Sequence, residues 1–281
     1  IGLKALIEVI DRNKVFTISD VVFGLAPRIN AAGRIEHGAK AVELMVQEDI
    51  ELARAKAQAV NQHNLKRREL DQSITEEALQ MIITDAKSTV VFHPDWHKGV
   101  VGIVASRLIE SHYRPTIVLT ENNGLLAGSA RSVKGFDVYD AIDDCSEYVE
   151  QFGGHKYAAG LTLKKENLEL FTAKFETVVS ANIQKEMLTP QVSIDLEIDI
   201  TDIDHKLYRI VRQMAPFGPG NMLPVFMSKK VVDRGYGRKI GQEKKHLKLS
   251  ITDKKRTQFL DCIGFDMADK FELIKDRQQF D

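Results

Sequence analysis

The sequence predicts a mixed α/β domain followed by a small β domain, with one long helix ahead of both. Three observations lead to this fold class. Residues 48–84 contain neither proline nor glycine and are rich in good helix formers. From residue 89 short apolar runs alternate with helical patterns, and beyond residue 190 the segments are short and strand-like. We therefore divide the chain into residues 1–47, 48–86, 87–187 and 188–281.

Composition narrows the possible classes. A hydrophobic fraction of 43% and a charged fraction of 28% in 281 residues are typical of a globular protein. No apolar run approaches the roughly 18 residues that span a membrane, so we expect no membrane association. The two cysteines, Cys145 and Cys262, form no C-x-x-C pair, which fits a reducing, cytoplasmic location. Because the sequence opens on Ile1 within a helical pattern, we expect a fragment of a longer chain.

The first 86 residues are predicted to contain one dominant element. Residues 17–40 are punctuated by glycine, and we predict irregular structure for them. The run that follows is predicted to form a helix of about 50 Å, at ~1.5 Å per residue. Its apolar stripe is thin, which indicates a connecting helix between domains rather than a core element.

The compact α/β domain at 87–187 follows from alternating patterns. We predict helices at 100–113, 138–149 and 167–186, the second of them capped by Asp137. Strands are predicted at 89–93, 115–120, 125–132 and 160–163. In residues 188–281 we predict a short helix at 205–215 and strands at 193–200, 223–232, 245–252 and 257–265. Short strands with basic turns favour a small β-barrel of the oligonucleotide-binding (OB) type, with an incomplete sheet.

Charge is strongly segregated along the chain. The net charge of −1 argues weakly against nucleic-acid binding. However, residues 229–256 hold eleven Lys or Arg against three acids, whereas residues 137–150 hold six acids and no base. A polyanion responds to such a local field rather than to the mean. We predict a nucleic-acid surface with Tyr236 as a stacking partner, carried mainly by the cations Lys230, Arg234, Arg238 and Lys245.

The string FGGHKYAAG at 152–160 is the most informative motif. Gly153 and Gly154 let the backbone turn sharply and approach a ligand, and His155 can donate to a phosphate or a base edge. An isolated Gly-Gly-His is more often a simple turn. Here, Gly128-Ser129-Ala130-Arg131-Ser132 precedes it at a strand end. The two hydroxyls and the guanidinium can hold a phosphate by charge-assisted hydrogen bonds.

Metal binding by these residues is weakly indicated. His93 and His97 lie four residues apart, but Pro94 interrupts any helix there. Asp137, Asp140 and Asp144 share a helix face, where a cap and a solvated acidic surface are the expected roles. We therefore predict no metal site in this chain.

Taken together, these strings resemble a known family. The string GGHKYAAG resembles the hallmark of the DHHA1 domain, which accompanies the DHH phosphoesterase domain. LAPRINAAGR at 25–34 resembles the tail of the phosphoesterase domain of RecJ-type exonucleases, and APFGPGNMLPVF and KHLKLSI resemble the OB domain that follows in that family. The resemblance covers nearly the whole chain. Residues 1–47 would then be the end of a DHH domain.

The resemblance implies a function. RecJ-type enzymes degrade single-stranded DNA from 5′ to 3′ in repair and recombination, with Mn or Mg ions held partly by an Asp-His-His triplet that this sequence lacks. This chain would then bind the strand while the hydrolytic metals lie elsewhere in the parent. The resemblance implies that Arg28 and Asn30 neutralise phosphate at the edge of the active site. Arg34 would assist, although a structural salt bridge is an equal expectation. Single-stranded DNA, single-strand-binding protein and a helicase are the expected partners of a monomer.

Two alternatives stay open. Strings of the GGHxxAAG type also occur in the RNA-binding C-terminal domain of alanyl-tRNA synthetases. Short-oligonucleotide and cyclic-dinucleotide phosphodiesterases share both the DHH and the DHHA1 domains, but generally lack a following barrel.

Overall fold

The chain folds into two compact units. The structure, a computed structural model, describes residues 1–10, 16–253 and 258–281. Unit 1 comprises residues 1–190 and unit 2 residues 191–281. Within the described part of the chain, no helix has the length and apolar character that a membrane crossing requires.

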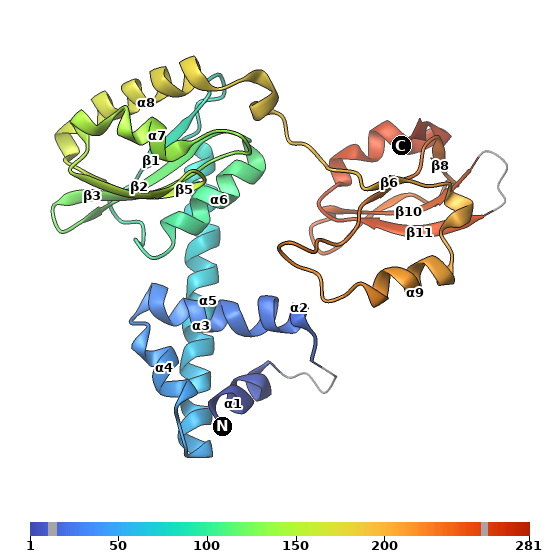
Figure 1. Cartoon of the computed structure of the whole chain (residues 1–281), viewed down its shortest axis with the longest axis horizontal. Coiled ribbons are helices and arrows are strands. Elements are labelled where there is room, and N and C mark those ends of the chain that lie inside the picture. Colours follow the sequence, from blue (N-terminus) through green and yellow to red (C-terminus); the bar gives the residue numbers. More distant parts are fainter. Residues whose placement is uncertain (11–15, 254–257) are drawn as a thin grey trace. The chain divides into compact units, whose positions relative to one another are not determined.

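Unit 1 begins with short helices packed against one long helix, α5 (Figure 1). Small residues allow this close packing: Ala53 and Ala57 of α5 are fully buried, as are Ala31 and Ala32 on the facing helix α3. The helices are α1 (Gly2–Val9), α2 (Ile18–Asp20), a π-helical turn (Val21–Leu25), α3 (Ala26–Ile35), α4 (Ala39–Met45) and α5 (Ile50–Gln80).

The irregular structure predicted for residues 17–40 is wrong, because this stretch is largely helical. Thr17 starts it with a capping box, in which the Asp20 carboxylate accepts from the Thr17 backbone N–H at 3.0 Å. Pro27 lies in the first turn of α3, where a missing N–H breaks no helical hydrogen bond. Burial of alanines against α5 outweighs the helix-breaking signals on which the prediction relied.

Helix α5 is both a connector and a core element. It covers Ile50–Gln80 within the predicted 48–86, with Asp49 as its N-cap. Its first half is buried among α1, α3 and α4, and Ile74 and Ala78 in its second half pack against the next domain. The expectation of a helix outside any core is therefore wrong. A thin apolar stripe is enough here because the buried alanines Ala53, Ala57 and Ala78 let the neighbouring elements pack closely against α5.

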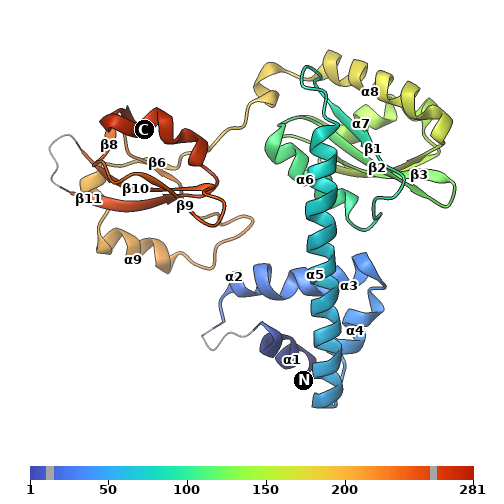
Figure 2. The ribbon, with the colours of Figure 1, turned by 180° about the vertical axis from the view of Figure 1, so that it is seen from behind.

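The rest of unit 1 is a five-stranded sheet with helices on both faces. The strand order is β1-β2-β3-β5-β4, with β1 parallel to β2 and the other pairs antiparallel. Helices α7 and α8 cover one face, and α6 packs on the other face over β2 and β3 (Figures 1 and 2). The elements are β1 (Thr89–Phe92), α6 (Val101–Ser111), β2 (Thr116–Asn122), β3 (Leu125–Arg131), α7 (Val138–Asp143), β4 (Gln151–His155), β5 (Ala158–Leu163) and α8 (Leu168–Asn182).

The Gly-Gly-His string lies in a strand rather than in the predicted turn. It forms most of β4, and the chain reverses only at residues 156–157 before β5 begins. Gly154 has a φ of +151°, and a Cβ there would lie 2.3 Å from the carbonyl oxygen of Ala158. This position therefore requires glycine for the strand pairing itself.

Unit 2 is a small β domain, as predicted, and its sheet is open. Its strands pair in the order β11-β10-β8-β12, and β9 also pairs with β10. The predicted strand 193–200 is reduced to two residues, because β6 pairs only with the equally short β7. The elements are β6 (Leu196–Glu197), α9 (His205–Gln213), β7 (Phe226–Met227), β8 (Val231–Asp233), β9 (Arg238–Ile240), β10 (His246–Thr252), β11 (Phe259–Gly264), α10 (Phe271–Ile274) and β12 (Gln279–Phe280).

Candidate nucleic-acid interface

A cleft of about 580 Å³ lies in unit 1 on the sheet face that carries α6. Because α6 covers β2 and β3, the strands β5 and β4 leave part of this face open. The other walls are the start of α6 and the end of α3. The main lining residues are Gly33, Arg34, Lys98, Gly99, Gly102, Ser129, Arg131, Gln151, Gly153, Gly160 and Thr162.

Strand register explains why these residues meet. Ser129 of β3 lies opposite Gly160 of β5, which lies opposite Gly153 of β4. Residues directly opposite in antiparallel strands point to the same face, so these three form one row across the cleft floor. The next row contains Arg131, Ala158 and His155 in the same manner. Strands lie about 4.8 Å apart, so His155 and Arg131 face the same side about 10 Å from each other.

Hydrogen bonds from one nitrogen of its guanidinium hold Arg131 in place. Its Nη1 donates to Ser129 Oγ at 2.9 Å and to the carbonyl of Ala130 at 2.8 Å. Burial lowers the pKa of its guanidinium, and the charge of Arg34 lowers the pKa further. Among the described residues, no carboxylate forms an ion pair with Arg131 or with Arg34. Two cations without a counter-ion in one cleft favour a bound anion.

The start of α6 adds to this anion site. Its N-cap, Val100, provides no side-chain cap, and Lys98 and Gly102 line the cleft beside it. The unsatisfied N–H groups and the helix dipole at such an end attract anions. A Cβ on Gly102 would lie 2.9 Å from Ser129 Oγ and 3.0 Å from Arg131 Nη2. Glycine at position 102 therefore leaves room for the guanidinium at the helix end.

The two glycines of the motif differ in whether the protein fold requires glycine at that position. A Cβ on Gly153 would have no atom within 4 Å, unlike one on Gly154. The protein fold therefore does not need glycine at position 153. Because Gly160 is also open, with only one atom at 3.9 Å, the floor between these strands is bare. A flat floor beside an anion site suits a polymer backbone.

Several predicted residues have other contacts. Ser132 Oγ donates to the carbonyl of Phe136 at 3.0 Å and does not line the cleft. Arg28 donates from Nε to Asn61 Oδ1 at 2.8 Å and from Nη1 to the carbonyl of Gly24 at 2.7 Å. Neither Arg28 nor the exposed Asn30 lines the cleft, whereas Arg34 does. His155 is exposed; its Nδ1 accepts from the Tyr157 N–H at 3.3 Å, so the neutral ring carries its proton on Nε2.

Unit 2 has a second candidate surface, a groove of about 320 Å³. The Arg234 guanidinium lies 4.2 Å from the ring centre of Phe259 and 5.6 Å from that of Tyr236. Both rings are more than half exposed, at 59% and 66%. Exposed rings combined with arginine are the usual elements of a single-strand binding groove. The lining residues are Arg234, Tyr236, Arg238, Lys248, Leu249, Ser250, Phe259 and Asp261.

Buried Asp233 builds the turn that presents this groove. Its carboxylate accepts from the backbone N–H groups of Gly235 at 2.8 Å, Gly237 at 2.9 Å and Ser250 at 3.0 Å. Gly235 has a positive φ of 100°, which suits the tight turn. Arg234 and Tyr236 leave this turn on the groove side.

The basic cluster is only partly gathered in this groove. Arg234 and Arg238 line it, but Lys230 and Lys245 do not. Lys245 pairs with Glu243, and the Lys230 N–H donates to Asp281 Oδ1 at 2.8 Å. Residues 254–257, which include three of the counted cations and the start of the strand predicted at 257–265, lie outside the described residues. Sequence patterns missed Phe259 and Lys248, although Lys248 alternates with buried residues on β10 and Phe259 with half-buried residues on β11.

Neither surface has a cluster of possible metal ligands among the described residues. In the part of the chain that the structure describes, no three His, Cys, Asp or Glu side chains gather in a way that could hold a metal ion. Asp137 caps α7, its Oδ1 accepting from the N–H groups of Tyr139 and Asp140.

Comparison with known proteins covers both units. Residues 80–181 match the family model of the DHHA1 domain, and residues 194–281 match that of the RecJ OB domain. The single-stranded-DNA-specific exonuclease RecJ of Bacillus subtilis (strain 168) is 35% identical over 280 residues, which are 98% of this chain and 35% of the relative. That of Escherichia coli (strain K12) is 31% identical over 282 residues, 95% of this chain and 48% of the relative.

Solved structures agree with this. The crystal structure of RecJ from Thermus thermophilus in complex with Mg²⁺ has a TM-score of 0.81 and 26% identity, covering 94% of this chain and 40% of that one. A second structure, of exonuclease RecJ bound to manganese, has a TM-score of 0.59 and 30% identity, covering 65% of this chain and 46% of that one. The chain thus spans less than half the length of these relatives. With both domains in this order, the chain belongs to the RecJ family.

Proposed function

We propose that this chain is the strand-binding part of a single-stranded-DNA exonuclease of the RecJ type, active in DNA repair and recombination. The observation that carries the proposal is the pair Arg34 and Arg131, which share one cleft without a carboxylate partner among the described residues. In this role the cleft holds the phosphate at the end of the strand. The groove of unit 2 stacks bases further along the same strand.

The geometry supports a role for each residue in this proposal. Arg131 and Arg34 bind phosphate oxygens by charge, and Ser129 keeps the Arg131 guanidinium aimed at the helix end. His155 donates from Nε2 to the terminal nucleotide across the bare floor of Gly153 and Gly160. Arg234 and Arg238 bind backbone phosphates in unit 2, between the two exposed rings. Arg28 and Asn30, which do not line the cleft, neutralise phosphate at the edge of the active site.

Hydrolysis itself is assigned elsewhere. The described residues offer no cluster that fits a metal ion, so no metal-dependent step is derived from them. We propose that the intact enzyme cleaves the phosphodiester with Mg or Mn ions bound by residues that this sequence does not contain. Residues 1–47 would then belong to a DHH domain, 48–86 to the connecting helix, 87–187 to the DHHA1 domain and 188–281 to the OB domain. Single-strand-binding protein and a helicase are the proposed partners of a cytoplasmic monomer.

Binding of labelled oligodeoxythymidylate to the whole chain, measured by fluorescence anisotropy, tests this function. Affinity should be higher for a strand with a 5′-phosphate than with a 5′-hydroxyl, and should fall steeply with salt. Unlabelled transfer RNA should compete poorly. Stronger competition by transfer RNA than by DNA would instead support the RNA-binding alternative, and equal binding of both strand ends would remove the role assigned to the cleft.

A further inference from the structure

The apolar packing of α5 is interrupted in the middle of the helix. Its first half belongs to one apolar cluster, whose last buried residue on α5 is Val60. Its second half belongs to another, whose first buried residue on α5 is Ile74. Between them, the buried residues of α5 are the polar Asn64 and Asp71. The two parts of unit 1 therefore meet over a polar segment of the helix that joins them.

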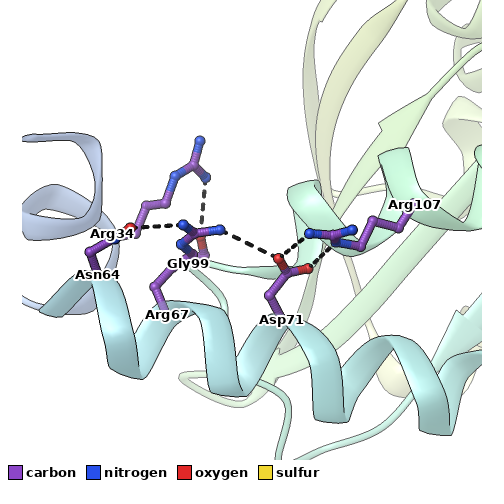
Figure 3. A network of polar contacts seen from close by, with 6 residues as sticks. All are labelled: Arg34, Asn64, Arg67, Asp71, Gly99 and Arg107. Atoms are coloured by element: carbon purple, nitrogen blue, oxygen red, sulfur yellow. Dashed lines mark hydrogen bonds and ion pairs between the residues drawn. The ribbon is translucent and has the colours of Figure 1, made fainter. Parts of the chain in front are cut away.

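Asp71 is the centre of this segment (Figure 3). It is only 1% exposed. Arg107 of α6 binds both carboxylate oxygens, from Nε at 2.7 Å and from Nη2 at 2.9 Å. Arg67 donates to Asp71 at 3.4 Å and to Asn64 Oδ1 at 2.7 Å. The hydrogen bond to Asp71 raises the pKa of the Arg107 guanidinium. A buried carboxylate needs such partners, and removing its charge leaves them without an anion.

The contact between α3 and the start of α6 lies in the same region (Figure 3). Arg34 Nη1 donates to the carbonyl of Gly99 at 3.1 Å. A Cβ on Gly99 would lie 2.1 Å from the backbone oxygen of Arg34, so these two backbones touch. This contact joins the two parts of unit 1 at the wall of the cleft.

The charges around this junction are unbalanced. Burial lowers the pKa of Arg67 most, and the charge of Asp71 raises it. The charges of Arg68, Arg107 and Arg34 lower it again. The charge of Arg34 also lowers the pKa of Arg131. Arg34 thus lies within electrostatic reach of both Arg67 and Arg131, and Asp71 is the carboxylate that bonds to this group in the described structure. Without Asp71, repulsion between Arg67 on α5 and Arg107 on α6 would push these two helices apart.

We propose that Asp71 is a positioning residue that sets the width of the phosphate cleft. It holds Arg107 on α6 and Arg67 on α5, and so fixes the distance between Arg34 on α3 and Arg131 on β3. Asp71 does not touch the ligand. The inference rests on the proposed function, in which these two arginines bind one strand end.

The test compares the whole chain with its D71N variant, which has nearly the same shape but no charge. We expect D71N to bind 5′-phosphorylated oligodeoxythymidylate about tenfold more weakly. The matched control is Arg54→Gln on the same helix, which removes exposed ion pairs with Glu8 and Glu51 far from the cleft. This control should bind as the parent does, and Asp71→Glu should recover part of the affinity.

A distance measurement separates positioning from a merely structural role. Spin labels at Lys40→Cys on α4 and Glu169→Cys on α8 report on the two parts of unit 1, in a Cys262→Ser background where Cys145 is fully buried. We expect a broader distance distribution in D71N, narrowed again by the oligonucleotide. A lower melting temperature with unchanged affinity and distances would overturn the proposal.

Failure of the proposed function gives a different result. If Arg131→Ala binds the strand end as well as the parent, the cleft is not the phosphate site. Only the distance distributions would then test whether Asp71 fixes the junction. Identical distributions in the parent and in D71N would refute that role as well.

Discussion

The cleft of unit 1 and the groove of unit 2 use arginine in different ways. In the cleft, Arg131 is half-buried at a helix end, over a floor from which side chains are missing. In the groove, Arg234 lies on the faces of exposed rings, beside Arg238 and Lys248. The first arrangement suits a phosphate at one fixed point, whereas the second suits bases of any identity along a strand. The cleft thus suits the end of a polymer, and the groove suits positions along it.

The largest expected effect comes from Arg131→Ala. Loss of a charged hydrogen-bond donor costs about 1.5–3 kcal/mol, so the affinity for a 5′-phosphorylated strand should fall about 10- to 100-fold. The loss should be much smaller for a strand with a 5′-hydroxyl. Anisotropy titrations with both strands measure the difference. Equal losses for both would mean that the cleft does not distinguish strand ends.

Phe259→Ala should weaken binding in a way that depends on the length of the strand rather than on its 5′ end. A base stacked on an aromatic ring contributes about 1–3 kcal/mol, and this contact forms only when the strand reaches the groove. Affinity for long oligonucleotides should therefore fall, while that for dinucleotides stays unchanged. Titrations over a series of strand lengths test this. A loss that is the same at every length would contradict separate roles for the two surfaces.

The two glycines of β4 should separate stability from binding. Gly154→Ala places a methyl group against the backbone of Ala158 at a φ of +151°, and should destabilise unit 1 by about 1–3 kcal/mol. A Cβ at position 153 has no atom within 4 Å, so Gly153→Val should unfold at nearly the parent temperature while its side chain blocks the oligonucleotide. Thermal denaturation and anisotropy on both variants give the comparison. Normal binding by Gly153→Val would show that the floor is not used.

The smallest effect concerns salt. Each phosphate contact contributes to the slope of log affinity against log salt concentration, and its loss lowers that slope by about one. Arg131→Ala should show this change, whereas Phe259→Ala should keep the parent slope because stacking releases no counter-ions. Affinities at several salt concentrations are sufficient. A change of slope in Phe259→Ala would indicate that this ring mainly positions Arg234.

Sequence patterns predicted the order of domains better than the details of the site. The long helix and the strands 115–120 and 245–252 were clear because period and composition agreed there. Ser129, Arg131 and Gly153, which line the cleft, were predicted as site residues because small residues cluster at a strand end. Arg34 was left undecided, because its separation from any carboxylate depends on how α3 folds against α6. Phe259 was missed since nothing local shows that its ring lies against the Arg234 guanidinium.

Other failures have the same cause. Ser132 has the right chemistry for phosphate binding, but strand alternation turns it away from Arg131, and its hydroxyl bonds to Phe136. Asp71 carries no signal in the sequence, because its role comes from arginines on two helices. Tertiary contacts, rather than local preference, decide such residues.

Strand β4 lies at one end of its sheet, and this place has a consequence for solubility. The outer backbone groups of an edge strand can pair with a strand from another molecule, which is a route to aggregation. Two adjacent glycines have low strand propensity and offer no side chains for such pairing. The same bare backbone that opens the floor of the cleft thus makes β4 a poor template for other chains. A bulky β-branched residue at Gly153 would raise the tendency of the protein to self-associate.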